Sequence, residues 1–151
     1  MSDELRELLE RARVEEVVTR LFLNTDKRDW AGVKACFAPT VLFDMSSAGG
    51  GRAGSVTPEH IAAGWETGLR PLEHIHHQAG NFVTKVSGDE ATVCCYGIAY
   101  HHKRTQSGRN TRTFVGSYDV SLRRGRDGVW TIHAFRFNLK FIDGNLELEK
   151  G

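Results

Sequence analysis

Apolar residues change their spacing near residue 75 of this 151-residue chain. Before that point they recur at the three- and four-residue spacing of amphipathic helices, and after it they alternate between turn sequences. The expected strands cover residues 76–86, 90–103, 111–123 and 129–141, separated by Ser-Gly-Asp, Gln-Ser-Gly and Gly-Arg-Asp-Gly turns. Helices followed by a strand meander predict an α+β fold, with the helices packed against an antiparallel sheet.

Two apolar stripes occupy the N-terminal segment. The first comprises Leu5, Leu8, Leu9 and Ala12, and the second comprises Val14, Val17, Val18 and Leu21. Because the stripes are out of phase, one straight helix cannot point both of them at the same core. We therefore expect residues 1–12 to form a separate N-terminal extension, able to cover a neighbouring subunit, and residues 13–25 to form the first main helix.

The middle of the chain predicts shorter elements. Residues 30–37 have helical spacing that ends before Pro39, and residues 41–45 are expected to form a short strand. Residues 46–56 are rich in glycine and poor in apolar side chains, which is typical of a mobile loop. Thr57 followed by Pro58 is typical of a helix N-terminus and predicts a helix over residues 58–69.

The last expected strand changes the face on which its apolar residues lie. Trp130, Ile132 and Ala134 share one parity, whereas Phe135, Phe137, Leu139 and Phe141 share the other. Such a switch predicts a β-bulge that bends the strand and curves the sheet. With no internal repeat or linker, the pattern indicates a single domain over residues 1–151.

Charge, apolar runs and cysteines exclude several classes of protein. The 20 Lys and Arg residues nearly balance the 19 Asp and Glu residues, so no general attraction to nucleic acid or anionic membranes is expected. No apolar run approaches the roughly 18 residues that cross a bilayer, and the charged start lacks a signal-peptide core, which predicts a cytoplasmic protein. Cys36, Cys94 and Cys95 lack the spacing of a disulfide framework or a cysteine zinc site.

Three local motifs carry a family resemblance. They are DKRDWAGVKACFAPTVLFD over residues 26–44, His76-His77 followed by Gly80-Asn81, and Asp127-Gly128-Val129-Trp130. Their order and spacing over residues 13–141 resemble the nuclear transport factor 2-like superfamily, in particular its SnoaL-like group and the scytalone dehydratase-like branch. The resemblance implies a cone-shaped, curved antiparallel sheet packed on three or four N-terminal helices, an α+β barrel with a pocket between the helices and the concave face.

The same resemblance implies a catalytic pair. In the lyases of this family an aspartate after the first long helix pairs with a histidine at the start of the first meander strand. The matching positions are Asp26 and His77, with His76 as the alternative if the register slips by one residue. A second pocket histidine falls on His101.

Further positions of the scytalone dehydratase-like branch bind substrate or water. A Ser-x-Asn pair falls on Ser117 and Asp119, and Asn138 is a further hydrogen-bond donor if it faces inward. Two water-binding tyrosines fall on Thr25 and Met45, so a ring-hydroxyl electrophile is expected to be missing.

These residues predict acid-base chemistry. A histidine that donates one ring proton to a carboxylate is fixed in one tautomer and becomes more basic, so Asp26 would orient His77 as the base, with His101 as the second group. Trp65 and Phe137 are expected to line the pocket for a small hydrophobic substrate. We therefore expect a cofactor-independent dehydratase or isomerase, with a non-catalytic binding or accessory protein of the same fold as the alternative.

Two further expectations concern metals and assembly. His74, His76, His77, His101 and His102 suggest a metal site, but strand alternation separates His74 and His76 from His77, and no carboxylate has a clear ligand spacing, so no metal is expected. A homo-oligomer, dimer or trimer, is expected because the outer sheet face would carry apolar side chains, namely Tyr96, Ile98, Phe114 and Leu122.

Overall fold

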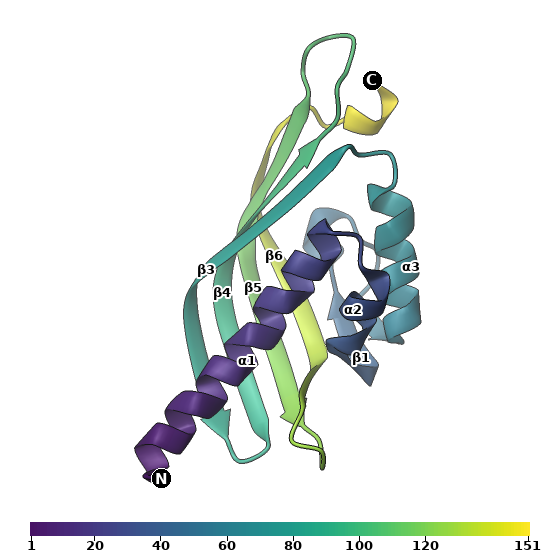
Figure 1. Cartoon of the computed structure of the whole chain (residues 1–151). Coiled ribbons are helices and arrows are strands. Elements are labelled where there is room, and N and C mark those ends of the chain that lie inside the picture. Colours follow the sequence, from purple (N-terminus) through teal and green to yellow (C-terminus); the bar gives the residue numbers. More distant parts are fainter.

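The computed structural model describes all 151 residues, as helices packed against one curved sheet (Figure 1). The helices are α1 (Asp3–Asp26), α2 (Trp30–Ala35) and α3 (Pro58–Leu69). The strands are β1 (Phe37–Asp44), β2 (Gly54–Val56), β3 (His74–Ser87), β4 (Glu90–His102), β5 (Thr111–Arg124) and β6 (Trp130–Gly144). Two 3₁₀ turns cover Ser46–Ala48 and Leu148–Lys150. The predicted α+β class is confirmed.

The sheet has the strand order β2-β1-β6-β5-β4-β3. Strands β3 to β6 form the predicted antiparallel meander, whereas β1 runs parallel to β6 and pairs with β2 on its other side. The edge strands β2 and β3 do not pair with each other, so the curved sheet stays open instead of closing into a barrel. The register shift between Ser121 and Leu122 in the β5–β6 pairing confirms the predicted bulge.

The core lies between α1 and the concave face of the sheet, which α1 crosses diagonally (Figure 1). Its fully buried side chains include Val14, Val18 and Leu21 of α1 and Val93, Leu122 and Ile132 of the sheet. Each such side chain stabilises the fold by about 1.5–3 kcal/mol relative to an exposed position. These side chains fill the concave face along most of α1, and a cavity remains near the C-terminal end of this helix.

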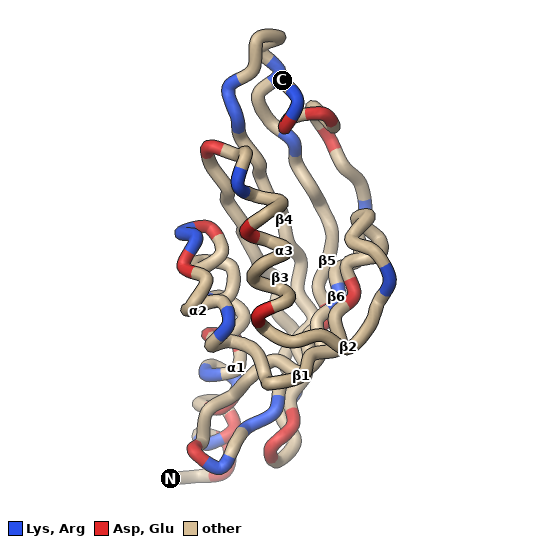
Figure 2. The backbone as a smooth tube through the Cα atoms, turned by 90° about the vertical axis from the view of Figure 1, so that its right-hand side faces the viewer, with Lys and Arg blue, Asp and Glu red and all other residues tan.

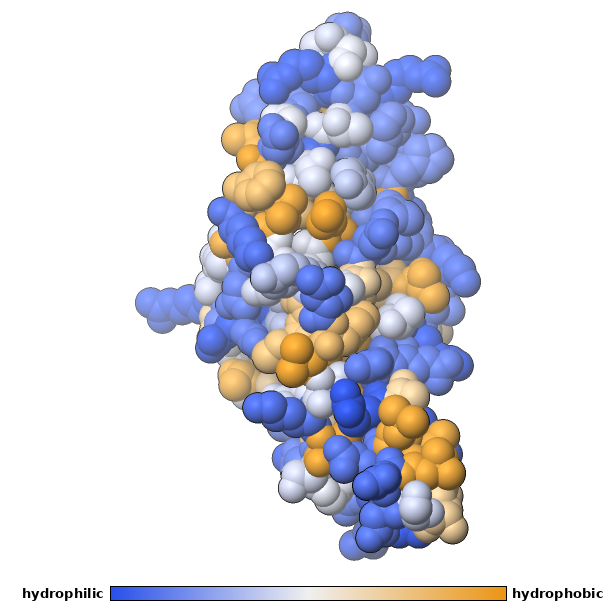
Figure 3. Space-filling view, turned by 90° about the vertical axis from the view of Figure 1, so that its left-hand side faces the viewer, coloured by the Kyte–Doolittle hydropathy of each residue, from blue (hydrophilic) through white to orange (hydrophobic).

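A single helix replaces the predicted extension and main helix. α1 runs unbroken from Asp3 to Asp26, with the Ser2 hydroxyl as its N-cap, so residues 1–12 do not form a separate element. The second apolar stripe is buried, but Leu5, Leu8 and Leu9 remain 47%, 59% and 38% exposed. Apolar side chains gather at the lower end of the molecule in Figure 3, at the level of this half of α1. The two stripes need not share a core, because the first lies on the surface.

The middle segment contains more strand than its sequence predicts. β1 begins at Phe37 and includes Pro39, which was expected to separate a helix from a strand. Between Phe37 and Val41 no residue of β1 pairs with β6 or β2, so the missing N–H of Pro39 removes no ladder hydrogen bond. The glycine-rich residues 46–56, predicted as a mobile loop, contain a 3₁₀ turn and β2.

Two residues predicted on the outer face lie on the concave face. Leu122 is fully buried, and the Phe114 ring packs against His101 with the ring centroids 5.1 Å apart. Ala99 pairs with Phe114 in the β4–β5 register, and strand alternation then places Tyr96 and Ile98 on the outer face. The apolar outer surface is smaller than predicted.

Basic and acidic residues are interspersed along the chain and do not gather in one region (Figure 2). None of the three helices combines the length and the apolar character that crossing a bilayer requires.

Candidate active site

Asp26 and His77 meet where α1 ends against β3. Asp26 Oδ1 lies 2.7 Å from His77 Nδ1, and Asp26 Oδ2 accepts a hydrogen bond of 2.9 Å from the His77 backbone N–H. The side chains of His77 and Asp26 are only 16% and 15% exposed. Because an ionised carboxylate can only accept, the ring proton lies on Nδ1. His77 Nε2 is therefore left with its lone pair, as a general base requires.

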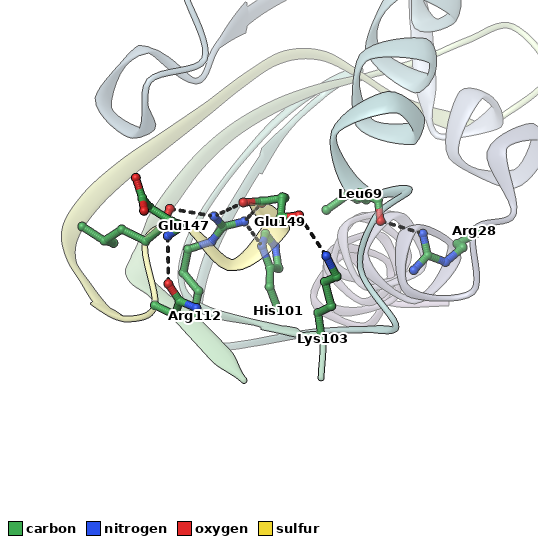
Figure 4. A network of polar contacts seen from close by, with 9 residues as sticks. Arg28, Leu69, His101, Lys103, Arg112, Glu147 and Glu149 are labelled. Atoms are coloured by element: carbon green, nitrogen blue, oxygen red, sulfur yellow. Dashed lines mark hydrogen bonds and ion pairs between the residues drawn. The ribbon is translucent and has the colours of Figure 1, made fainter. Parts of the chain in front are cut away.

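The turn after α1 holds Asp26 in place. Arg28 adopts a left-handed backbone conformation with φ of 59°, two residues after Asp26. Its guanidinium donates a hydrogen bond of 2.9 Å to the carbonyl of Leu69 (Figure 4) and one of 2.6 Å to the carbonyl of Leu72. These bonds join the end of α1 to the end of α3, so the charged run around Asp26 has a structural role as well as a candidate catalytic one.

Strand alternation and stacking orient His77. It pairs with Ala99 on the concave face, whereas its neighbour His76 points outward beside Tyr100, with ring centroids 6.2 Å apart. Phe22 of α1 stacks on the His77 ring, with centroids 5.5 Å apart and an interplanar angle of 13°. The inward histidine is thus His77, and the register alternative does not apply.

His101 has the opposite arrangement of donor and acceptor. Its Nδ1 lies 3.0 Å from a guanidinium nitrogen of Arg112, and because a guanidinium can only donate, Nδ1 accepts and the proton lies on Nε2. Burial, followed by the positive charge of Arg112, lowers the pKa of His101 to about 4. The ring is therefore neutral at pH 7, and its free N–H is a hydrogen-bond donor.

The C-terminal 3₁₀ turn holds Arg112 against His101 (Figure 4). Glu149 binds both terminal nitrogens of Arg112, one of them at 3.0 Å, and the hydrogen bond from Arg112 lowers the pKa of Glu149. Lys103 Nζ donates to the Glu149 carbonyl at 2.9 Å, and Leu148 in the same turn is fully buried. No sequence pattern predicted this contribution, because the turn carries no motif.

A cavity of about 220 Å³ opens beside the two histidines, between α1, α3 and the concave face. It is lined by Phe22, Thr25, Gly64, Trp65, Gly68, Leu69, His77, His101, Tyr118 and Phe135. Trp65 thus lies where the sequence predicted. Phe137, predicted to line the pocket, is instead buried in the core behind Tyr118, and Phe135 occupies the cavity wall.

Tyr118 supplies a ring hydroxyl that was expected to be missing. Its ring is only 5% exposed and packs against Phe22 and Phe135, with centroids 4.9 and 5.4 Å apart. A Cβ atom on Gly97 would overlap this ring, so the glycine makes room for it. The hydroxyl hydrogen-bonds to no protein group, and burial raises its pKa. The phenol therefore stays protonated and is free to donate to a ligand.

Ser117, Asp119 and Asn138 lie on the opposite face of the sheet. Asn138 Nδ2 donates to Asp119 at 2.8 Å and to Ser117 Oγ at 3.3 Å, so the three residues form their own outer cluster. Tyr118 pairs with Cys95 on the concave face, which turns both of its neighbours outward. The predicted role of Ser117 and Asp119 in the pocket is therefore wrong. The prediction was one residue out of register, and a shift of one residue turns every side chain of a strand to the other face of the sheet.

The profile of the SnoaL-like domain matches residues 6–136. No functionally curated protein matches the sequence. Among solved structures, the Kfla4162 protein from Kribbella flavida has a TM-score of 0.87 at 20% identity, covering 99% of this chain and 100% of that chain. A type 2 hexachlorocyclohexane dehydrochlorinase has a TM-score of 0.78 at 17% identity, with 96% and 95% covered. A scytalone dehydratase candidate from Novosphingobium aromaticivorans has a TM-score of 0.77 at 16% identity, with 91% and 89% covered.

At these identities the structural similarities show a shared fold and no more. The domain profile covers most of the chain, including both α1 and the meander. The chain belongs to the SnoaL-like domain family.

Proposed function

We propose that this protein is a cofactor-independent dehydratase or isomerase that acts on a small hydrophobic substrate carrying carbonyl and hydroxyl groups. The observation that carries the proposal is the Asp26 carboxylate, which binds both the ring and the backbone N–H of His77 beside an apolar cavity. The cavity is smaller than the roughly 300–1,000 Å³ of pockets for drug-sized ligands, which favours a compact substrate.

His77 is the base in this account. Its Nε2 takes a proton from the carbon beside the substrate carbonyl, and the electron pair of that C–H bond moves into an enolate. The positive charge that develops on the ring is stabilised by Asp26, 2.7 Å from Nδ1. Phe22 stacked on the ring excludes water from one side of the imidazole.

His101 and Tyr118 stabilise the enolate oxygen. Both are neutral donors that line the cavity, and both are largely buried, where hydrogen bonds to developing charge are stronger than in water. In an elimination the enolate electron pair expels the β-hydroxyl group, which takes the proton from His77 and leaves as water. In an isomerisation the same proton returns to a different carbon.

The names of two structurally similar proteins agree with this class of reaction. One is a hexachlorocyclohexane dehydrochlorinase and the other a scytalone dehydratase candidate, and both names describe eliminations. The proposal itself depends on Asp26 and His77 of this chain.

The proposal is tested with a panel of hydroxylated aromatic ketones in D₂O. NMR would follow deuterium incorporation beside the carbonyl and loss of the hydroxyl group. We expect the wild type to catalyse exchange or elimination on part of the panel, and His77→Gln and Asp26→Asn to lower the rate by about 10²–10⁴-fold. His76→Gln is the matched control, on the same strand but facing outward, and should retain the wild-type rate.

Two outcomes would contradict the proposal. An undiminished rate in His77→Gln would show that His77 is not the base. Ligand binding without turnover, with an affinity that His77→Gln leaves unchanged, would instead support a binding protein of the same fold.

A further inference from the structure

Three side chains of metal-ligating type converge where β3 begins and β4 ends. Glu73, His74 and His102 each place one ligand atom within 4.8 Å of the others. His74 and His102 pair directly in the β3–β4 register, with ring centroids 5.5 Å apart. The register places both on the outer face, because their neighbours Ile75 and His101 pair on the concave face. The cluster is therefore separate from the cavity.

The surroundings of the cluster favour a bound cation. His102 Nδ1 is buried and has no hydrogen-bond partner, which is unusual for a buried polar atom. Glu73 accepts a hydrogen bond of 2.7 Å from the Arg104 backbone N–H through Oε1, which fixes the carboxylate and leaves Oε2 free. The neighbouring Lys103 ammonium donates instead to the Glu149 carbonyl, at 2.9 Å.

We propose that Glu73, His74 and His102 bind a divalent transition-metal ion such as Zn²⁺, which ties the start of β3 to the end of β4. Two imidazoles and one carboxylate suit zinc and its neighbours in the first row, whereas Mg²⁺ and Ca²⁺ require mostly oxygen ligands. Ligand atoms of a tetrahedral zinc site lie about 3.4 Å apart, as follows from bond lengths of about 2.0–2.2 Å. The Glu73 carboxylate stays on the Arg104 N–H, the exposed His74 ring rotates toward the free Oε2 to reach that spacing, and water takes the fourth position.

The sequence did not reveal this site because His102 is distant along the chain from Glu73 and His74. The histidine pattern alone predicted no metal, since no carboxylate stood at a recognisable ligand spacing from the histidines. Only the pairing of β3 with β4 brings His102 to the two residues that precede and open β3.

The test is zinc titration of protein that carries no histidine tag, followed by calorimetry. We expect the wild type to bind one equivalent of Zn²⁺ and no Mg²⁺, and His74→Ala and Glu73→Gln to lose at least tenfold in affinity. Gln keeps an oxygen that accepts from Arg104, so the second variant removes mainly the charge. His76→Ala is the matched control, because it lies on the same strand and face but outside the cluster.

Thermal unfolding gives an independent readout. Zn²⁺ should raise the Tm of the wild type and of His76→Ala, but not that of His74→Ala. Because His74 is exposed, His74→Ala should fold and can show whether the site binds Zn²⁺. The His102 side chain is half-buried, so His102→Ala is not needed for the test even if it fails to fold. The site would be ruled out if the wild type bound no Zn²⁺ saturably, if His74→Ala kept wild-type affinity, or if His76→Ala lost as much as His74→Ala.

Discussion

His77 and His101 carry the same ring but have opposite hydrogen-bond partners. A carboxylate accepts the Nδ1 proton of His77, whereas a guanidinium donates to Nδ1 of His101. The charged neighbour of each ring therefore decides which nitrogen is free to act in the cavity. One histidine offers a lone pair and the other an N–H donor at the same pH, which is what proton abstraction beside a carbonyl requires.

The Tyr118 hydroxyl should contribute to turnover without contributing to stability. It has no partner in the protein, so Tyr118→Phe should change the free energy of unfolding by less than about 0.5 kcal/mol. If the hydroxyl stabilises the enolate, its removal should lower kcat by about 10²-fold. The check is kcat together with urea denaturation, and Tyr96→Phe on the outer face is the control. Unchanged kcat in Tyr118→Phe would remove the residue from the mechanism.

The sequence predicted some residues of the site and misplaced others for a definite reason. Asp26 and His77 were predicted from the family resemblance, which places them at a helix end and a strand start. The strand that carries Ser117 and Asp119 has nearly the predicted bounds, but those bounds do not decide which alternate residues face inward. The motif match assigned the odd-numbered residues of this strand to the pocket, whereas the even-numbered Tyr118 faces inward.

Among the elements, α3 covers the cavity with two glycines one turn apart. A Cβ atom on Gly64 or Gly68 would meet no atom within 4 Å, so both positions leave space for a ligand. Because glycine is a poor helix former, Gly64→Ala should raise the free energy of unfolding by about 1 kcal/mol.

Gly64→Leu should weaken the binding of larger ketones more than that of smaller ones. A size series of ligands tests this, and equal affinities across the series in Gly64→Leu would contradict it.

The boundaries of two elements could not be predicted because they depend on tertiary contacts. Out-of-phase stripes suggested a break in α1, yet the helix continues because its first stripe is left on the surface. Pro39 suggested a helix end, yet β1 tolerates it in a stretch that pairs with neither neighbour. In contrast, the bulge of β6 was predictable, since a parity switch is a property of the sequence itself.

At the scale of the whole molecule, Glu10 links the N-terminal half of α1 to the end of β5 and the start of β6. Glu10 is 8% exposed, accepts a hydrogen bond of 2.6 Å from Trp130 Nε1 and lies 3.2 Å from the Arg124 guanidinium. The hydrogen bond from Trp130 is the main cause of its lowered pKa. A depressed pKa in the folded state stabilises the fold above the ordinary carboxyl pKa of 4.5, and this stabilisation is lost as the pH falls through the lowered value.

Glu10→Gln should therefore destabilise the protein in a pH-dependent way. At pH 7 we expect a loss of about 2 kcal/mol in the free energy of unfolding, because a buried charged acceptor is removed. The difference from the wild type should shrink as the pH falls below 4.5. Denaturation at a series of pH values measures it. Glu16→Gln, at an exposed ion pair with Arg20, is the control and should cost less than about 1 kcal/mol. A pH-independent difference for Glu10→Gln would contradict this role.

We propose that the chain forms a homo-oligomer, a dimer or trimer, and that the exposed stripe of α1 takes part. Leu5 and Leu8 are 47% and 59% exposed on the same face of the helix. Analytical ultracentrifugation should find a dimer or trimer in the wild type, and Leu8→Glu should shift it toward monomer. A monomeric wild type at micromolar concentration would contradict the proposal.

The placement of protons on the two site histidines can be measured without a substrate, and it shows whether Asp26 orients His77 as a base. Long-range ¹H–¹⁵N NMR of the imidazole rings distinguishes the two tautomers at about pH 8, above the ordinary imidazole pKa of roughly 6.5. We expect His77 to carry its proton on Nδ1 and His101 on Nε2, and Asp26→Asn to remove the preference of His77 while leaving His101 unchanged. If both rings were the same tautomer in the wild type, or if His77 were insensitive to Asp26→Asn, the base and its orienting carboxylate would be wrongly assigned.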